Sequence, residues 1–272
     1  MIGSSMEQKI KEKYDIVCEK YGKDSIVGIF VYGSTNYGLA DSISDLDTKA
    51  IVLPHFEDIV RSKQWVTDTI INADDSHTEV KDIRNMFDCY RKQNVNFLET
   101  LFTKYYYLNP DYTGEWLGAI IKNREKIAHY DECKAVKAMY GNMLTKYKNM
   151  YKLMPHSTAE IEKYGYAFKD YHHLMRLAQF IRRYISGEKY EDCLIAEDRE
   201  QLIRYKREPF PLTEVMETVQ NTLESTKKLV DDTLDAWSEI KKADKEVEDI
   251  LHQVEFDFIK QSLLHDLVTE NG

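Results

Sequence analysis

The stretch "IFVYGSTNYGLADSISDLDTKAIVLP", residues 29–54, holds two short apolar runs joined by a polar loop. The first run ends in Gly33-Ser34, and Asp45 and Asp47 stand at the head of the second. β-branched and aromatic residues favour buried strands, so the two runs predict two strands. The stretch is therefore either a hairpin with two solvated carboxylates or a site in which turn and aspartates surround a metal-bound phosphate.

The two aspartates have a spacing that suits a divalent cation. Alternate side chains of a strand point the same way, so Asp45 and Asp47 are expected on one face, about 6–7 Å apart at Cα. Mg²⁺ prefers oxygen ligands and keeps waters for substrate phosphates. Glu79, in the strand-like "HTEVKDI", would complete a two-metal site for in-line displacement at phosphorus. The other acids open for this third position are Asp68, Asp74, Asp75 and Asp82.

The Gly33-Ser34 pair predicts an anion-binding turn. A glycine at a strand end lets backbone N–H groups approach phosphate oxygens, and the serine hydroxyl adds a donor. Gly-Ser after a strand is common in ordinary turns, and Asp-x-Asp pairs are commonly solvated. The order of strand, Gly-Ser, Asp-x-Asp and a later strand acid is more specific than any one part, and it favours the site.

The amino-acid composition narrows the kinds of protein to which this chain can belong. The chain has 272 residues, 43% hydrophobic and 31% charged, which is globular composition. Its net charge of −10 argues against non-specific coating of nucleic acid, but residues 142–184 hold eight Lys/Arg against three Asp/Glu. This basic island indicates an anion site or a solvated helix face. The four cysteines lie far apart, which predicts free thiols in a reducing cytoplasm. No apolar stretch reaches about 18 residues and the chain starts with polar residues, so we expect no membrane partner.

The patterning predicts an α+β fold with two domains, 1–111 and 112–272. The first is a small mixed β-sheet with flanking helices, and the second is a helical C-terminal half. Gly22, Pro155, Gly187, Pro209 and Pro211 end helices. The expected strands lie within 25–33, 47–54, 65–71, 77–83 and 104–110. The expected helices lie within 6–22, 83–92, 113–127, 130–154, 160–186, 195–206, 213–240 and 244–268.

Two further segments carry polar groups of interest. In "KDYHHLMRL", the i, i+3, i+4 and i+7 positions share one helix face and predict donors for a triphosphate: Lys169, His172, His173 and Arg176. The alternative is a solvated basic face on which one of the two adjacent histidines, His172 or His173, packs. In "NVNFLETLF", Glu99 lies among core residues, and a buried glutamate needs a hydrogen-bonding or cationic partner.

The pattern Gly33-Ser34, Asp45-Leu46-Asp47 and Glu79 resembles that of the DNA polymerase β superfamily of nucleotidyltransferases. The stretches "VKDIRNMF", "NVNFLETLF" and "GYAFKDYHHLMRLAQFIRRYISGE" are similar to its prokaryotic and phage branch of YcgL/RlaP-like proteins, where RlaP denotes RNA-ligase-associated protein. The resemblance covers residues 26–210 and implies a palm-like sheet, two Mg²⁺ or Mn²⁺ ions and an NTP such as ATP held by the Gly-Ser turn.

The same resemblance implies transfer of a nucleotidyl group to a hydroxyl with release of pyrophosphate. Asp45, Asp47 and Glu79 would hold metal, and Glu79 or a metal-bound hydroxide would help deprotonate the hydroxyl. Gly33, Ser34 and the basic helix would bind the nucleotide. The acceptor implied first is an RNA or tRNA end, as in RNA repair. A protein or small-molecule hydroxyl, or a non-catalytic interaction protein that keeps the fold, stays open.

Overall fold

The computed structural model describes residues 2–41 and 44–269 and divides into two compact units. The sheet unit consists of Met1–Asn36, Ala40–Tyr130 and Asp244–Gly272, and the helical unit consists of Tyr37–Leu39 and Asp131–Ala243. The expected boundary after residue 111 would place the segments 112–130 and 244–272 with the helices. In the structure both segments are grouped with the sheet unit, in which Trp116 of the first segment packs against Phe30 of the sheet and Phe258 of the second segment.

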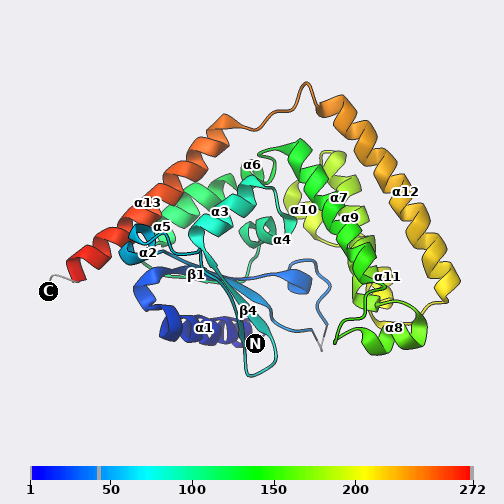
Figure 1. Ribbon diagram of the computed structural model, residues 1–272, viewed down its shortest axis with the longest axis horizontal. Helices are drawn as coiled ribbons and strands as arrows, with labels where there is room; N and C mark the ends of the chain where they lie inside the picture. Colours follow the sequence, from blue (N-terminus) through cyan, green and yellow to red (C-terminus); the bar gives the residue numbers. More distant parts are fainter. Residues whose placement is uncertain (1, 42–43, 270–272) are drawn as a thin grey trace. The chain divides into compact units, whose positions relative to one another are not determined.

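The sheet has five strands in the order β3-β4-β2-β1-β5 (Figure 1). β2 and β4 run parallel, and the neighbouring pairs are antiparallel, so the sheet is mixed as the sequence predicts. The strand bounds are β1 Ile26–Val31, β2 Thr48–Val52, β3 Thr67–Ile71, β4 His77–Asp82 and β5 Tyr106–Leu108.

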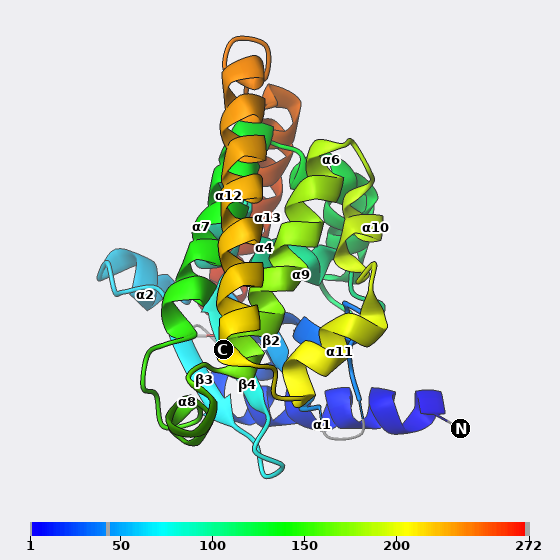
Figure 2. The same cartoon turned by 90° about the vertical axis from the view of Figure 1, so that its right-hand side faces the viewer.

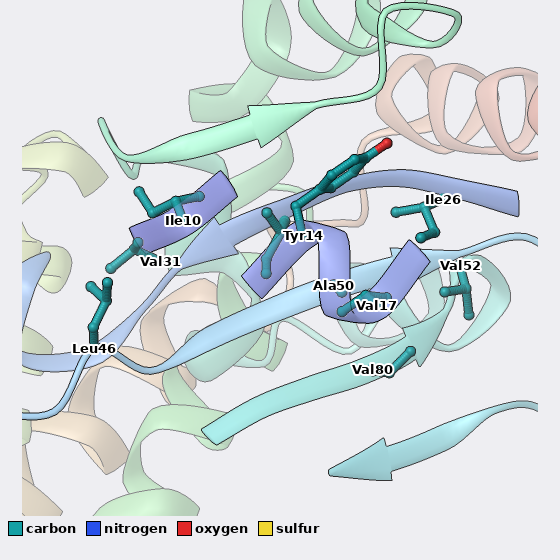
Figure 3. Close-up of a cluster of buried hydrophobic side chains, with 10 residues drawn as sticks. Ile10, Tyr14, Val17, Ile26, Val31, Leu46, Ala50, Val52 and Val80 are labelled. Atoms are coloured by element: carbon teal, nitrogen blue, oxygen red, sulfur yellow. The ribbon is translucent and has the colours of Figure 1, made fainter. Parts of the chain in front are cut away.

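Helix α1 (Ile2–Tyr21) covers one face of this sheet (Figure 3). Its apolar residues Ile10, Tyr14 and Val17 follow the 3.6-residue period and are at most 3% exposed. Each buried apolar side chain of this size contributes about 1.5–3 kcal/mol, so this helix is a main source of stability for the sheet. Its partners from the sheet side of the cluster are Ile26, Ile29, Val31, Leu46, Ala50, Val52 and Val80.

Aromatic side chains cover the opposite face. Trp116 is fully buried, with its ring centroid 5.2 Å from that of Phe30 in β1, 6.5 Å from Phe87 and 6.2 Å from Phe258. Phe87 belongs to α3 (Ile83–Arg91) and Phe258 to α13 (Lys245–Thr269). The helix predicted over 113–127 is a succession of short turns: α5 (Thr113–Glu115), the π-helix η4 (Trp116–Ile120), η5 (Ile121–Asn123) and α6 (Arg124–Ala128).

Short turns complete the sheet unit around the strand ends. The turn η2 (Gly33–Thr35) directly follows β1, and α4 (Val95–Leu98) leads into η3 (Glu99–Leu101). The remaining two are η1 (Lys23–Ser25) and α2 (Phe56–Val60).

In the helical unit, α7, α9 and α12 pack along one another (Figure 2). Helix α9 is strongly amphipathic and ends at Ile185, two residues before Gly187, whose φ of +85° suits glycine. The predicted α+β class with a helical C-terminal half is confirmed. The bounds are α7 Glu132–Asn149, α8 Thr158–Tyr164, α9 Phe168–Ile185, α10 Tyr190–Leu194, α11 Arg199–Arg207 and α12 Leu212–Trp237.

Bilayer-spanning helices require both length and sustained apolar character. Within residues 2–41 and 44–269, no helix combines the two to the degree that crossing a membrane demands.

Candidate active site

The Gly-Ser turn lies beside the aspartate pair at the ends of β1 and β2. The backbone N–H of Tyr32 donates to the carbonyl oxygen of Asp47 at 3.1 Å, which extends the β1–β2 pairing to the edge of the turn. The N–H of Asn36 closes the turn on the Gly33 carbonyl at 2.9 Å. Gly33 has a φ of +82°, in the left-handed region that glycine occupies without steric cost. The polypeptide therefore changes direction sharply next to Asp47.

One N–H group of this turn is already used. The backbone N–H of Gly33 donates to Glu99 Oε2 at 2.8 Å, and Asn36 Nδ2 lies 3.4 Å from the same oxygen. Glu99 is 1% exposed, so it has the hydrogen-bonding partner that its burial requires. An anion at this turn would thus meet the N–H groups and hydroxyls of the half-buried Ser34 and Thr35 rather than the Gly33 N–H that the sequence suggested.

The aspartate pair precedes β2. Asp45 is exposed and the Asp47 side chain is 30% exposed, while Leu46 between them is buried in the core. Asp47 Oδ1 accepts a hydrogen bond from the backbone N–H of His77 at 3.0 Å, and the His77 Nδ1 atom lies 3.6 Å from it. One carboxylate is thus oriented by the neighbouring strand β4, and the other is open to solvent.

Glu79 lies directly opposite Lys49 in the parallel register of β2 and β4. Its Oε2 is 2.9 Å from Lys49 Nζ, its Oε1 accepts from the Tyr32 hydroxyl at 2.9 Å, and Lys81 Nζ lies 3.8 Å away. Burial alone would raise the pKa of Glu79, but the Lys49 charge and these hydrogen bonds lower it below its ordinary value. Glu79 is therefore ionised at neutral pH, and a buried cation balances its charge.

Lys49 and Tyr32 are components of the site that the sequence reasoning missed. Lys49 is 2% exposed, and its Nζ lies 3.5 Å from the centroid of the Tyr32 ring and 5.1 Å from that of Phe97. Burial and the negative charge of Glu79 raise the pKa of Tyr32, which therefore stays protonated and donates. A lysine inside the apolar run "KAIVL" was the available signal, because a buried cation requires a partner.

Asp45 and Asp47 are the carboxylates of the motif that precede β2 next to the turn. Within the described ranges, no three His, Cys, Asp or Glu side chains are grouped closely enough to hold a metal ion, so Glu79 does not converge with Asp45 and Asp47. Two carboxylates that leave other positions to water and phosphate oxygens are a set that Mg²⁺ accepts.

The other acids open for the third position have different partners. Asp68 binds Lys20 and Tyr21, and Asp82 caps α3 and binds Arg84. Asp74 binds Ser76 in the β3–β4 turn. Asp75 lies in the same turn with a φ of +62°. These contacts hold the three paired acids at other parts of the sheet unit.

In the helical unit, Arg176 of α9 is a buried cation with unused donors. It is 4% exposed, and its guanidinium carbon lies 3.7 Å from the centroid of the Tyr37 ring. Its Nε and Nη1 atoms donate no hydrogen bond within the described part of the chain. Buried donors without partners are rare in proteins, and an anion would satisfy both atoms.

Further positive groups surround Arg176 on the α9 side. Burial, followed by the fields of His172, Lys146, Arg176 and Lys169, lowers the pKa of His173 well below its ordinary value. His173 is half-buried, Lys169 is exposed, and Lys146 lies 3.3 Å from Asp170. The α9 cation patch is defined here as Lys169 and Arg176 of α9 with Lys146 of α7, and His173 lies near them as a neutral donor.

His172 faces the interior instead. It is 2% exposed, and its Nδ1 lies 2.7 Å from the Leu202 carbonyl oxygen in α11, which fixes the Nδ1–H tautomer. Burial lowers the pKa of His172 to about 4. Of the two adjacent histidines, His172 is therefore the one that packs.

Comparison with known proteins adds little to this geometry. No protein-family model matches the chain, and no curated protein matches its sequence. Among solved structures, the chain is similar to a nucleotidyltransferase-like protein from Exiguobacterium sibiricum, with a TM-score of 0.33 and 12% identity over 84% of this chain and 76% of that one. A TM-score this low supports no argument on fold or activity, so the proposal below is based on the residues of this chain.

Proposed function

We propose that this protein is a metal-dependent nucleotidyltransferase that moves a nucleotidyl group from an NTP to a hydroxyl acceptor. The observation that carries the proposal is the hydrogen bond from Tyr32 N–H to the Asp47 carbonyl, which sets the Gly33–Thr35 turn against the aspartate pair. The turn can offer N–H and hydroxyl donors to a phosphate group, and the neighbouring aspartates can offer carboxylates to the cation that accompanies it. The motif resemblance to the DNA polymerase β superfamily, and to its YcgL/RlaP-like branch, points to the same chemistry.

Asp45 and Asp47 would hold Mg²⁺ or Mn²⁺. When bound, the ion would neutralise phosphate charge and make the phosphorus more open to attack. Asp47 is oriented for this role by the His77 N–H. Glu79 is a weak proton acceptor because its pKa is lowered, so we assign it to holding Lys49 and Tyr32 beside the turn.

The nucleotide would be bound through its phosphates. Ser34 offers a hydroxyl and an N–H at the turn. On α9, Lys169 and Arg176 offer cationic donors and His173 offers a neutral one. In the transfer, the acceptor hydroxyl oxygen forms a bond to the α-phosphorus, and the bond from that phosphorus to the bridging oxygen breaks. Pyrophosphate leaves with the electron pair, and the hydroxyl proton passes to solvent.

We propose an RNA end, such as that of tRNA, as the acceptor, and a cytoplasmic role in RNA repair. The basic island within 142–184 favours a polyanionic acceptor. The net charge of −10 instead favours a protein or small-molecule hydroxyl, which is the second candidate. If RNA is the acceptor, its binding must weaken steeply as salt is added, because Lys and Arg contacts release counterions from the phosphates.

The test is incubation with each α-³²P-labelled NTP and Mg²⁺, together with total RNA or with cell protein. Label on RNA supports the proposal, and label on protein selects the second candidate. Asp47→Asn is expected to lose at least about 100-fold in labelling while keeping the circular dichroism of the parent, because one metal ligand is gone. Asp111→Asn, at an exposed aspartate of the same unit, is the matched control. Labelling that persists in Asp47→Asn, or that no NTP supports, contradicts the proposal.

A further inference from the structure

A buried polar network joins α1 to the turn between β3 and β4. Lys13 of α1 is 4% exposed, and its Nζ donates to Ser76 Oγ and lies 3.6 Å from Asp74 Oδ1. A buried ammonium is tolerated only with such partners, so α1 and the turn are held to each other. The other buried members are Asn72, Thr48 and Thr78, with Thr48 Oγ1 and Thr78 Oγ1 2.9 Å apart.

Asn72 fixes one peptide group of this turn. The Ser76 carbonyl oxygen accepts hydrogen bonds from the Asn72 backbone N–H and from Asn72 Nδ2, both at 2.9 Å. Asn72 Nδ2 also lies 3.1 Å from Thr78 Oγ1 and 3.3 Å from Ser76 Oγ, which holds the amide in place. The carbonyl side of the Ser76–His77 peptide is therefore held by two donors from one residue.

The other side of the same peptide reaches the aspartate pair. The His77 N–H belongs to the Ser76–His77 peptide and donates to Asp47 Oδ1 at 3.0 Å. A peptide group is planar, so donors that fix its carbonyl oxygen also fix the direction of its N–H. Asn72 thus acts on the Asp47 carboxylate through this rigid peptide, and Lys13 acts on the same residue through the Ser76 hydroxyl, although neither touches Asp47.

We propose that Lys13 and Asn72 are positioning residues that hold the Asp47 carboxylate in the orientation in which it binds the divalent cation. The inference rests on the proposed function, since it gives Asp47 a cation to bind. Residues that orient a metal ligand typically change metal affinity by 10- to 100-fold when they are replaced. Loss of the Lys13 ammonium would leave Ser76 less firmly held, and so would loss of the Asn72 amide, with the Asn72 backbone N–H as the remaining donor from that residue. Either loss would loosen the hydrogen bond to Asp47.

The test compares Lys13→Met and Asn72→Asp with the control Lys9→Met, at an exposed lysine of the same helix. The first removes the ammonium and keeps an apolar side chain, and the second keeps the shape but lacks the Nδ2 donors. Exchange of the His77 amide hydrogen, measured by NMR without metal, is expected to be at least about tenfold faster in both variants and unchanged in the control. The Kd for Mn²⁺, measured by electron paramagnetic resonance, should rise about 10- to 100-fold.

Lys13→Arg keeps a positive charge and hydrogen-bond donors at this position, so it should keep most of the Mn²⁺ affinity of the parent. This result would show that Lys13→Met loses affinity because the ammonium is missing and not because the variant folds poorly. If His77 exchange is unchanged in both Lys13→Met and Asn72→Asp, the network does not fix the Ser76–His77 peptide. If exchange is faster but the Kd for Mn²⁺ is unchanged, fixing the peptide does not orient Asp47 for the cation. If the parent protein neither binds Mn²⁺ nor transfers label, the proposed function and the metal role of Asp47 are both wrong. The His77 exchange rates would still show whether Lys13 and Asn72 hold the hydrogen bond from the His77 N–H to Asp47.

Discussion

Lys49 Nζ lies 2.9 Å from Glu79 Oε2, across the parallel strands β2 and β4. The acid that the motif assigns to metal binding is therefore already paired with a cation that is 2% exposed. Since Lys49 is buried, this pair cannot open without leaving an ammonium in a poorly solvated position. The relationship makes Glu79 part of the support of the site and leaves Asp45 and Asp47 as the carboxylates available to an ion.

Replacement of Glu79 by glutamine should test this pairing. We expect the free energy of unfolding to fall by about 2–3 kcal/mol, because Lys49 stays buried without its counter-charge; the partial exposure of Glu79 keeps the loss below that of a fully buried pair. Urea unfolding measures the change. Glu57→Gln, at an exposed ion pair with Arg61, should change it by less than about 0.5 kcal/mol. Equal stabilities of Glu79→Gln and the parent would contradict the structural role.

The same pair predicts a pH dependence. Glu79 has a folded-state pKa below its ordinary value of 4.5, so its ionised form stabilises the folded protein above that pH. The stabilisation is lost as the pH falls through the folded-state pKa, because protonation removes the charge that pairs with Lys49. The stability difference between parent and Glu79→Gln should therefore be constant from about pH 7 to pH 5 and shrink below pH 4.5. Urea unfolding over this range checks it, and a difference that grows on acidification would be inconsistent.

Gly33→Ala should isolate the backbone requirement of the turn. Nothing lies within 4 Å of a Cβ added at Gly33, so the cost comes from its φ of +82° alone, and we expect a loss of about 1–2 kcal/mol. Gly33→Asn should cost less, because asparagine tolerates this region better. At Gly28 the added Cβ would instead lie 2.8 Å from Leu108 Cδ2 and Tyr107 O, so Gly28→Ala should cost more. An undiminished stability of Gly33→Ala, measured in urea, would refute the argument.

Arg176→Met should report on anion binding by the α9 cation patch. Inorganic pyrophosphate is expected to raise the Tm of the parent protein but not that of the variant, since Met fills space without donors. The KM for NTP in the labelling assay should rise about tenfold or more. Arg204→Met, at an exposed arginine paired with Glu208, is the matched control and should resemble the parent. If pyrophosphate stabilises parent and Arg176→Met equally, Arg176 does not bind it.

His172 should make the stability pH-dependent in the weakly acidic range. Its folded-state pKa of about 4 lies below the ordinary value of 6.5, so the unfolded chain binds the proton first. Stability should fall as the pH drops from about 6.5 towards 4, by up to about 3 kcal/mol. His172→Asn can still donate to the Leu202 carbonyl but does not titrate, so its stability should change less over this range. Identical pH profiles for both proteins would exclude His172 as the source.

Local patterns were enough to predict most of the elements. The β-branched run before Gly33 predicted β1, because the pattern depends on residues close together in the chain. The apolar period over 160–186 predicted the residues of α9, but Gly165, with a φ of +87°, divides the predicted helix into α8 and α9. The segment 113–127 is helical as predicted, but it changes between α, π and 3-10 turns instead of forming one regular α-helix. Its backbone follows the packing of Trp116 among rings from distant segments, which no local period encodes.

The composition of the site was harder to predict. Gly33, Ser34 and Asp47 come together because two strands pair, and the sequence order already implied that. The Lys49–Glu79 pair depends on the register of β2 against β4, and the Asn72 contacts depend on the turn conformation. Register and turn geometry arise from the whole sheet, so the partners of Glu79 could not be read from its neighbours in sequence.

The last helix of the sheet unit, α13, carries Phe258 to the Trp116 ring, whereas the intervening residues 131–243 form the helical unit. During synthesis, residues 131–243 of the helical unit therefore leave the ribosome before α13, which packs on the aromatic side of the sheet. Trp116 lacks its contact with Phe258 until α13 emerges, and a chain interrupted after residue 243 would leave this part of the aromatic cluster exposed to solvent.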